Sequence, residues 1–330
     1  MRRHVEVYLL GILAMSLTGP SPVAAAGAKV GSSASPVSVN VHRTNDSFLV
    51  TSGDRTLMEY QGAGVPFKPY VKLLTTPSGV NVLRDSPADH KHHHALMFAL
   101  GVDGVDFWGE AADAGHQEPK PATSVSTLVR DGAPQATIRQ ELTWSGNKSP
   151  LLSEQRSIAW GRTKDRSATL VTWQSKLTPA PGKEAVELTG HHYYGLGMRF
   201  LVSMDKGGKF FNSENKEGEI VRGDERLAPV RWTAYTASAD GKPVTVAMWP
   251  DPANPRHPAS MFTMSTPFAY LSATLNLWKE PMKLSRGQTL DLRYGVALWD
   301  GAVDPARVEA VYGEWVAAHP AVPSKGAAEK

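Results

Sequence analysis

The sequence predicts an all-β protein, a large antiparallel β-sandwich with one helix near the C-terminus. Short runs in which apolar and polar residues alternate recur along most of the chain, with Gly, Pro, Asn and Asp turns between them. That alternation is the pattern of half-buried strands. A convincing helical pattern, with apolar residues three or four positions apart, occurs only near residues 304–318. Many strands and a single helix favour a sandwich or barrel over a sheet wrapped by helices.

The clearest strands are expected at residues 136–144 and 290–298. In the first, Ala136, Ile138 and Trp144 share one parity, and polar residues occupy the other. In the second, leucine, tyrosine and valine alternate in the same way. Because successive side chains of a strand point to opposite faces, each run predicts one face packed on a core and one face toward solvent.

The helix is expected to begin at Asp304 and Pro305. Aspartate is a good N-cap, and proline is tolerated at the first helical position, where its missing N–H has no partner to lose. The residues that follow place one apolar stripe on the helix: Val308, Val311, Trp315 and Val316. The stripe predicts a helix that packs against the sandwich.

The first 26 residues resemble a secretory signal peptide. Arg2 and Arg3 give a basic start, residues 8–17 form a short apolar run, and residues 23–27 (VAAAG) supply the small side chains accepted at a cleavage site after Ala26. The apolar run is shorter than the roughly 20 residues that a membrane-spanning helix needs. We therefore expect an exported protein, periplasmic or extracellular.

The rest of the chain is expected to form one domain. Residues 27–36 are small and polar and predict a flexible lead-in, residues 37–320 carry the strands and the helix without a linker or an internal repeat, and residues 321–330 predict a disordered tail. No segment of the mature chain is apolar over a length that would span a membrane.

Composition excludes several classes of function. The formal net charge of the chain is +3, and its lysines and arginines are scattered, so a nucleic-acid partner is not expected. The chain has no cysteine, which excludes disulfides, thiolate nucleophiles and cysteine-bound zinc. Composition leaves the oligomeric state open, and a carbohydrate or another small molecule remains the expected partner.

A histidine cluster is the strongest functional signal. Residues 89–98 read DHKHHHALMF, with four histidines within five positions of a chain that has eleven. If this segment is extended, His90, His92 and His94 share one face and His93 points to the other. Such a cluster suits a metal site, acid–base chemistry or hydrogen bonding in a solvated groove, and spacing alone leaves all three open.

A divalent metal would need a third ligand from elsewhere in the chain. The candidates are His116, His191, His192, His257, Asp106 and Glu110. Without a decisive spacing, the metal and any other cofactor stay undetermined.

Three further segments carry polar and aromatic residues that suit a sugar groove. The segment GVDGVDFWGE brings carboxylates and an indole near the histidines in sequence, HHYYGLGMRF adds two histidines and two tyrosines, and DPANPRHP is a loop that its prolines make rigid. The expected substrate-binding residues are Asp89, His90, Asp106, Trp108, Glu110 and Asn254.

The segments RDSPADHKHHHALMFALGVDGVDFWGE, FFNSENKEGE and DPANPRHP resemble the bacterial family labelled methane oxygenase PmoA, over about residues 70–302. The family is common in polysaccharide-degrading bacteria. The resemblance implies a strand-rich fold similar to the large sandwich of galactose mutarotases and several polysaccharide lyases. It also implies a setting in sugar catabolism.

The match to the family's two motifs is partial. The first motif runs approximately D-H-P-H-H-R-G-L-W-F, and the residues that match it are Asp89, His90, His92, His93, Leu96 and Phe98. The second resembles H-P-x-N-x-R-H-P, and the residues that match it are Asn254, Arg256, His257 and Pro258. Lys91, His94, Ala95, Met97 and Asp251 depart from these patterns. His94 stands where the family has arginine, so the resemblance implies a cationic contact that is weaker or depends on pH. Lys91 adds a positive charge to the same segment.

Three hypotheses about function follow. The leading one is an exported carbohydrate-active enzyme that acts on a sugar or uronide by histidine acid–base chemistry. Its reaction would be ring opening, epimerisation or β-elimination. The second is a metal-dependent hydrolase or oxygenase that uses His90 and His92 as metal ligands, and the third is a non-catalytic glycan-binding module. The leading hypothesis makes His92, His93, Arg256 and His257 the catalytic residues, and it predicts that the two histidine motifs meet in one pocket.

Overall fold

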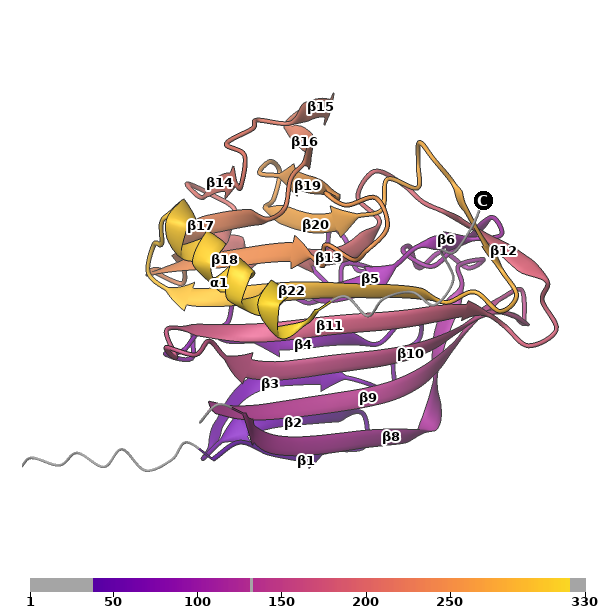
Figure 1. Ribbon diagram of the computed structural model, residues 1–330, viewed down its shortest axis with the longest axis horizontal. Helices are drawn as coiled ribbons and strands as arrows, with labels where there is room; N and C mark the ends of the chain where they lie inside the picture. The colour runs from indigo at the N-terminus through magenta and orange to yellow at the C-terminus, as the bar shows by residue number, and fades with distance from the viewer. Residues whose placement is uncertain (1–37, 131–132, 321–330) are drawn as a thin grey trace, which may run out of the picture. The chain divides into compact units, whose positions relative to one another are not determined.

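The computed structural model describes residues 38–130 and 133–320 (Figure 1). In these ranges the strands form three sheets and pair antiparallel throughout, and the one α-helix is α1 (Pro305–Ala318). The predicted fold class, an antiparallel β-sandwich with one helix near the C-terminus, is confirmed. The predicted signal peptide (1–26), lead-in (27–36) and tail (321–330) lie outside the described residues.

Two large sheets form the sandwich. The first has ten strands, in spatial order β1 (Asn40–Arg43), β2 (Ser47–Ser52), β3 (Arg55–Gln61), β4 (Tyr70–Leu74), β5 (Leu96–Ala99), β13 (Gly195–Arg199), β20 (Tyr270–Thr274), β19 (Ser260–Met264), β16 (Glu225–Pro229) and β15 (Glu219–Arg222). The second has eight, in order β14 (Lys209–Asn212), β17 (Thr233–Ala239), β18 (Lys242–Pro250), β22 (Leu290–Asp300), β11 (Ala168–Pro179), β10 (Ser149–Arg162), β9 (Ala133–Gly146) and β8 (His116–Arg130).

A small third sheet lies at one end of the sandwich. It has four strands, in order β21 (Met282–Ser285), β12 (Ala185–Thr189), β6 (Gly101–Val102) and β7 (Val105–Asp106). A short 3-10 helix, η1 (Val202–Met204), follows β13.

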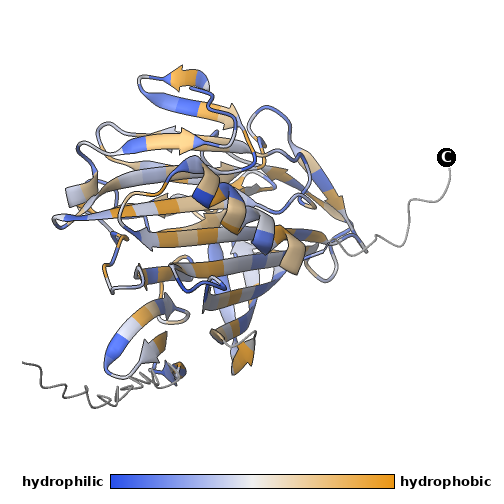
Figure 2. Ribbon diagram, turned by 60° about the vertical axis from the view of Figure 1, so that its left-hand side comes forward, coloured by the Kyte–Doolittle hydropathy of each residue, from blue (hydrophilic) through white to orange (hydrophobic). Residues whose placement is uncertain are grey.

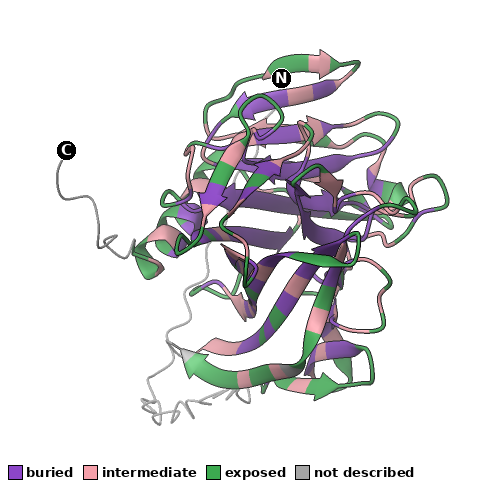
Figure 3. Cartoon of the chain, turned by 90° about the vertical axis from the view of Figure 1, so that its right-hand side faces the viewer, coloured by how far each residue is buried: buried purple, intermediate pink, exposed green. Residues whose placement is uncertain are grey.

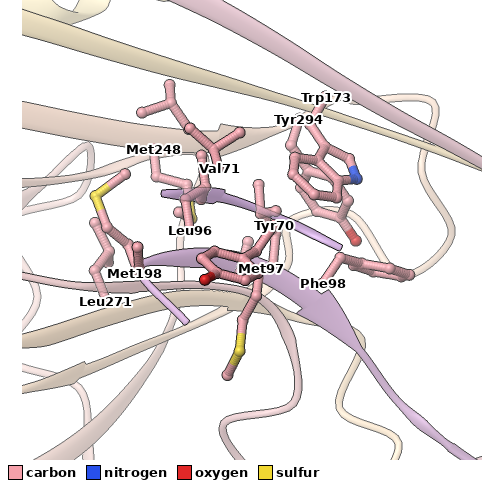
Figure 4. Close-up of a cluster of buried hydrophobic side chains, with 14 of the residues drawn as sticks. Tyr70, Val71, Leu96, Met97, Phe98, Trp173, Met198, Met248, Leu271 and Tyr294 are labelled. Carbon is pink, nitrogen blue, oxygen red and sulfur yellow. The ribbon is translucent and has the colours of Figure 1, made fainter. Parts of the chain in front are cut away.

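The main core fills the space between the two large sheets. Leu96 and Phe98 on β5 point into it, and the ring of Phe98 lies 6.2 Å from that of Tyr294 in the eight-stranded sheet (Figure 4). Met97, between them, points to the opposite face. Apolar and polar residues alternate along many of the other strands (Figure 2), because each of those strands turns only one face to the core.

Helix α1 covers the outer face of the eight-stranded sheet and closes a second apolar cluster (Figure 1). Its N-cap is as predicted, because the side chain of Asp304 accepts a hydrogen bond from Arg307 N at 2.8 Å. Trp315 packs in the cluster, and its indole N–H donates to Thr172 Oγ1 at 2.8 Å. The helix thus buries Ala297 and Trp299, the second parity of β22, which the sequence pattern had left for solvent.

The outer face of the ten-stranded sheet positions the candidate site. The loop before β5 lies over its middle strands, β5, β13 and β20. The hairpin of β15 and β16 forms one edge of the sheet. Its outer strand β15 is mostly exposed, like β8 at the edge of the other sheet (Figure 3). Over residues 38–130 and 133–320, no helix has the length and apolar character needed to cross a bilayer.

Candidate functional site

A pocket of about 520 Å³ opens on the outer face of the ten-stranded sheet. Its lining combines imidazoles from the loop before β5 with aromatic rings from β20 and from the loops after β7 and before β13. The residues that define it are His90, His92, His93, Trp108, Tyr193 and Tyr270. Segments far apart in sequence thus build one concave surface, as expected of a functional site.

The histidine loop is a pair of turns, not the extended segment considered from the sequence. His90 N donates to Pro87 O and His93 N donates to His90 O, both at 2.9 Å. The expected sharing of faces is therefore wrong. The rings of His90, His92 and His93 gather in one cluster, with centroids 4.6 to 5.8 Å apart, while His94 turns away into a separate network.

Two of the clustered imidazoles, those of His92 and His93, are held neutral. Burial, followed by the neighbouring His92 and His90, lowers the pKa of His93 to about 2. Burial, and then the charge of Lys68, also lowers the pKa of His92 below its usual 6.5. A neutral imidazole carries one N–H donor and one acceptor nitrogen, so each ring can both donate to and accept from a ligand hydroxyl.

His94 lies in a paired network behind the pocket. Its Nδ1 contacts Asp85 Oδ1 at 3.0 Å and its Nε2 contacts Glu110 Oε1 at 2.6 Å. Lys68, whose side chain is fully buried, donates to the same oxygen of Glu110 at 2.9 Å. Burial alone would lower the pKa of His94, but the hydrogen bonds to Asp85 and Glu110 raise it. Glu110 is therefore engaged in this network and is not among the residues that line the pocket.

Asp106 holds the aromatic side of the pocket in place. Its carboxylate accepts hydrogen bonds from Trp108 N at 2.8 Å and from Tyr194 Oη at 2.8 Å. The ring of Tyr194 stacks on the indole of Trp108, with centroids 5.0 Å apart. Asp106 thus positions Trp108 without lining the pocket itself, whereas Trp108 lines it as predicted.

Asp89 lies beside the histidine cluster but is not among the residues that line the pocket. Its Oδ2 is 3.1 Å from His90 Nδ1 and 3.6 Å from Arg199 Nη2. His90 itself lines the pocket. The two residues therefore connect the histidine cluster to Arg199, which the sequence presents only as the end of the HHYYGLGMRF segment.

The opposite wall comes from the β15–β16 hairpin and was not predicted. Glu225 Oε2 is 3.0 Å from His192 Nε2, and Glu225 Oε1 accepts from Arg222 Nη2 at 2.6 Å. Arg222 and Glu225 both line the pocket. The sequence signal was the Gly-Asp turn of VRGDE, typical of a hairpin, but nothing in it indicates which segment the hairpin faces.

The DPANPRHP loop lies elsewhere, and the prediction that the two histidine motifs share a pocket is wrong. The guanidinium of Arg256 donates to the carbonyls of Leu275 and Glu280, beyond the end of β20. The pocket takes Tyr270 from the start of that strand, and the four steps to its last residue span about 13 Å.

Two backbone contacts fix this loop against β22. Asn254 donates from Nδ2 to Arg293 O at 2.8 Å and accepts at Oδ1 from Arg293 N at 2.9 Å. His257 follows on the same loop, and burial lowers its pKa. The side-chain amide of Asn254 thus anchors the loop to β22, and Asn254, Arg256 and His257 do not line the histidine pocket.

A metal site was one interpretation of the cluster. Among the residues that the structure describes, no group of three or more His, Asp and Glu side chains is arranged to hold a metal ion. The rings of His90 and His92, the two ligands that the metal hypothesis needs, lie with centroids 5.8 Å apart at an angle of 63°.

Comparison with family models assigns the chain. Residues 47–313 match a family described as a family of unknown function (DUF6807). The chain belongs to this family. The match corrects the resemblance to the family labelled methane oxygenase PmoA, which the comparison does not support. No protein of curated function matches the sequence.

Several solved structures share part of the fold at very low identity. One is the galactosidase domain of an alpha-galactosidase-sucrose kinase, with 9% identity over 80% of this chain and a TM-score of 0.44. Another is an alpha-galactosidase from Geobacillus stearothermophilus in complex with raffinose, with 9% identity over 80% of this chain and a TM-score of 0.43. This chain spans 42% and 41% of their lengths.

A third structure is of similar size to this chain. It is a putative mutarotase from Salmonella typhimurium, with 12% identity over 79% of this chain and 94% of the other, and a TM-score of 0.35.

Proposed function

We propose that this protein is an exported carbohydrate-active enzyme that moves a proton on a sugar, with His92 as the base. The observation that carries the proposal is a pocket of about 520 Å³ in which three imidazoles face aromatic rings. This volume is in the range of small-molecule sites. Flat rings suit the apolar C–H faces of a pyranose, and imidazoles suit its hydroxyls.

The charge states of the histidines divide their roles. His92 is half-buried and neutral near pH 7, because burial and Lys68 lower its pKa, so its free nitrogen can accept a proton. His93, with a pKa of about 2, is too weak a base for proton transfer at neutral pH. Under this proposal His93 binds the substrate by hydrogen bonds, and it is not the second proton-transfer group expected from the sequence.

The β15–β16 hairpin, the wall opposite the histidine loop, supplies the second proton-transfer group. Glu225 stands on β16, which β13, β20 and β19 separate from β5 and the histidine loop. A sugar between these walls would have an imidazole on one side and a carboxylate, paired with His192, on the other. Ring opening, epimerisation and β-elimination all begin with transfer of a proton from a sugar O–H or C–H to a base, and this arrangement supports that class of reaction.

Export belongs to the same proposal, and the basic, apolar and small-residue segments before Gly27 support it. N-terminal sequencing of the protein recovered outside the cytoplasm of expressing bacteria tests it. A mature chain that begins at Gly27 supports export. A chain found only in the cytoplasm with Met1 or Arg2 first contradicts it.

Activity is tested by a screen of oligosaccharides, uronides and keto-sugars for product formation, followed by His92→Gln. We expect the variant to lose about 10²- to 10⁴-fold in kcat, while His116→Gln, outside the pocket, keeps the activity of the wild-type protein. Because the pKa of His92 is lowered, activity should persist below pH 6.5 and fall only at more acidic pH. Saturable sugar binding without turnover would instead favour a glycan-binding module.

A further inference from the structure

Buried hydrogen-bond donors without a partner gather at and behind the lining of the pocket, where His93, Trp108 and Tyr270 line it and Arg199 lies behind Phe268. Arg199 Nε and Nη1, His93 Nδ1, Tyr270 Oη and Trp108 Nε1 are all buried without a hydrogen-bond partner among the described residues. A buried polar atom left unpaired costs about 1–3 kcal/mol, and more when it is charged. Such a concentration in one place indicates a surface shaped for a ligand.

These donors lie next to one another. Arg199 and Tyr270 are paired residues on the neighbouring strands β13 and β20, so their side chains share a face. The ring of His93 is 5.1 Å from that of Tyr270, and the indole of Trp108 is 6.1 Å from it. Gly197 makes room for this arrangement, because a Cβ there would stand 2.2 Å from Tyr270 Oη.

Arg199 is the unusual member of the group. Its side chain is 1% exposed, and its guanidinium lies 3.3 Å from the centroid of the Phe268 ring, which lines the pocket. The nearest carboxylate is Asp89, whose Oδ2 lies 3.6 Å from Nη2, beyond hydrogen-bond distance. The Nε–Nη2 edge of a guanidinium can bind a carboxylate through two parallel hydrogen bonds. In Arg199 this edge therefore lacks a bidentate partner.

The carboxylates on the far wall are already engaged. Asp224 accepts hydrogen bonds from Ser265 N and Thr266 N, and Glu225 is bound by Arg222 and His192. Asp89 is half-exposed and shared with His90. Arg199, behind the pocket residue Phe268, is thus a buried cation on whose charge Asp89 and Asp205 act, while its Nε and Nη1 donors stay unused.

We propose that Arg199, Tyr270 and His93 form a subsite for the carboxylate of an acidic sugar, so that the substrate of this pocket is a uronide. Guanidinium binds a carboxylate by two parallel hydrogen bonds. Tyr270 adds a donor, because burial raises the pKa of its hydroxyl well above 10 and keeps it protonated. The inference rests on the proposed function and narrows its substrate class.

The test is calorimetric titration at constant ionic strength with two matched sets of probes. The acidic set is D-galacturonate, D-glucuronate and their disaccharides, and the neutral set is the corresponding galactose and glucose sugars. We expect the wild-type protein to bind at least one acidic sugar about 10- to 100-fold more tightly than its neutral counterpart, which is the contribution expected of hydrogen bonds to a charged group. A sulfated monosaccharide and sodium acetate distinguish carboxylate on a sugar from any anion.

Single substitutions test which residue causes the preference for acidic over neutral sugars. Arg199→Met should abolish it while leaving the binding of neutral sugars, and Tyr270→Phe should reduce it by about 2- to 10-fold. Arg43→Met is the matched control, because Arg43 also lies over a phenylalanine ring, that of Phe48, but on β1, outside the pocket. It should keep the full preference.

Several results would overturn the inference. Equal binding of acidic and neutral sugars by the wild-type protein refutes the subsite but leaves the proposed function standing. If Arg222→Met loses the preference for acidic sugars and Arg199→Met keeps it, the carboxylate binds at Arg222 on the β15–β16 hairpin and not at Arg199. Acidic sugar binding that is lost in Arg199→Met but never leads to turnover supports the subsite and refutes the enzyme. Absence of binding to every sugar refutes both.

Discussion

Two buried arginines, Arg156 in the core and Arg199 at the pocket, have opposite surroundings. Arg156 donates from Nε and Nη2 to the two carboxylate oxygens of Glu154, each at 2.8 Å. Its remaining bonds go to Pro69 O and Gln117 Oε1. The side chain of Arg199 is equally buried, but its Nε and Nη1 have no hydrogen-bond partner among the described residues.

The difference separates a structural charge from a functional one. A buried ion pair whose donors are all used holds strands together, because water or a ligand has nothing left to bind. A buried cation with free donors destabilises the folded protein and is tolerated where a ligand completes it. We therefore expect methionine to lower the free energy of unfolding by different amounts at positions 156 and 199.

The largest expected effect is on stability in Arg156→Met. Removing this guanidinium leaves Glu154, which is 1% exposed, as a buried charge without a counter-ion, at a cost of about 3–5 kcal/mol. Arg199→Met removes an unpaired charge and keeps a side chain that packs on Phe268, so its free energy of unfolding should stay within about 1 kcal/mol of the wild-type value. Urea unfolding of the two variants measures both.

Equal losses in the two variants would remove the distinction. In that case Arg199 stabilises the fold through contacts of the same strength as those of Arg156, and its unpaired donors carry no functional meaning.

A smaller effect separates two buried tyrosines. Tyr60 Oη donates to Gln140 Oε1 at 2.7 Å, so Tyr60→Phe leaves a buried acceptor unpaired and should lower the free energy of unfolding by about 1–2 kcal/mol. Tyr270 Oη has no partner, so Tyr270→Phe should leave stability unchanged or slightly raise it. Thermal unfolding followed by circular dichroism compares them, and a larger loss in Tyr270→Phe would contradict the account.

The smallest effect is a pH dependence of the network behind the pocket. The folded-state pKa of His94 is raised above its unfolded value through Asp85 and Glu110, so the stability it contributes is present below about pH 6.5 and is lost as pH rises through the folded pKa. The stability difference between the wild-type protein and His94→Gln should therefore shrink from pH 6 to pH 8.5. Both carboxylates stay ionised in this window, because their own pKa values are lowered. A difference that stays constant would show that His94 does not titrate there.

The sequence was informative about the fold because the relevant signals are local. The alternation in residues 136–144 reports one buried face, and the strand β9 there buries Ile138 and Trp144 as predicted. Asp304 and Pro305 likewise specify the start of α1 through contacts within one turn. The cover that α1 gives to the second face of β22 depends on tertiary packing, and alternation alone does not encode it.

The site was only half predictable for the same reason. His90, His92, His93 and Trp108 stand out by composition, and the pocket contains them. Whether a distant loop joins them depends on strand order, which brings Tyr270 and Glu225 into the lining of the same pocket and leaves Arg256 at the far end of β20. The unpaired state of Arg199 is a property of its neighbours, and it carries no sequence pattern.

The central claim is that the free donors of Arg199 receive the carboxylate of a sugar in this pocket. A crystal structure of the protein with a galacturonate disaccharide tests it most directly. We expect the sugar to lie over Trp108 and Tyr270, with a carboxylate oxygen within about 3.2 Å of Arg199 Nε or Nη2. A sugar bound with its carboxylate at Arg222 or in solvent, or bound outside the pocket, would contradict it.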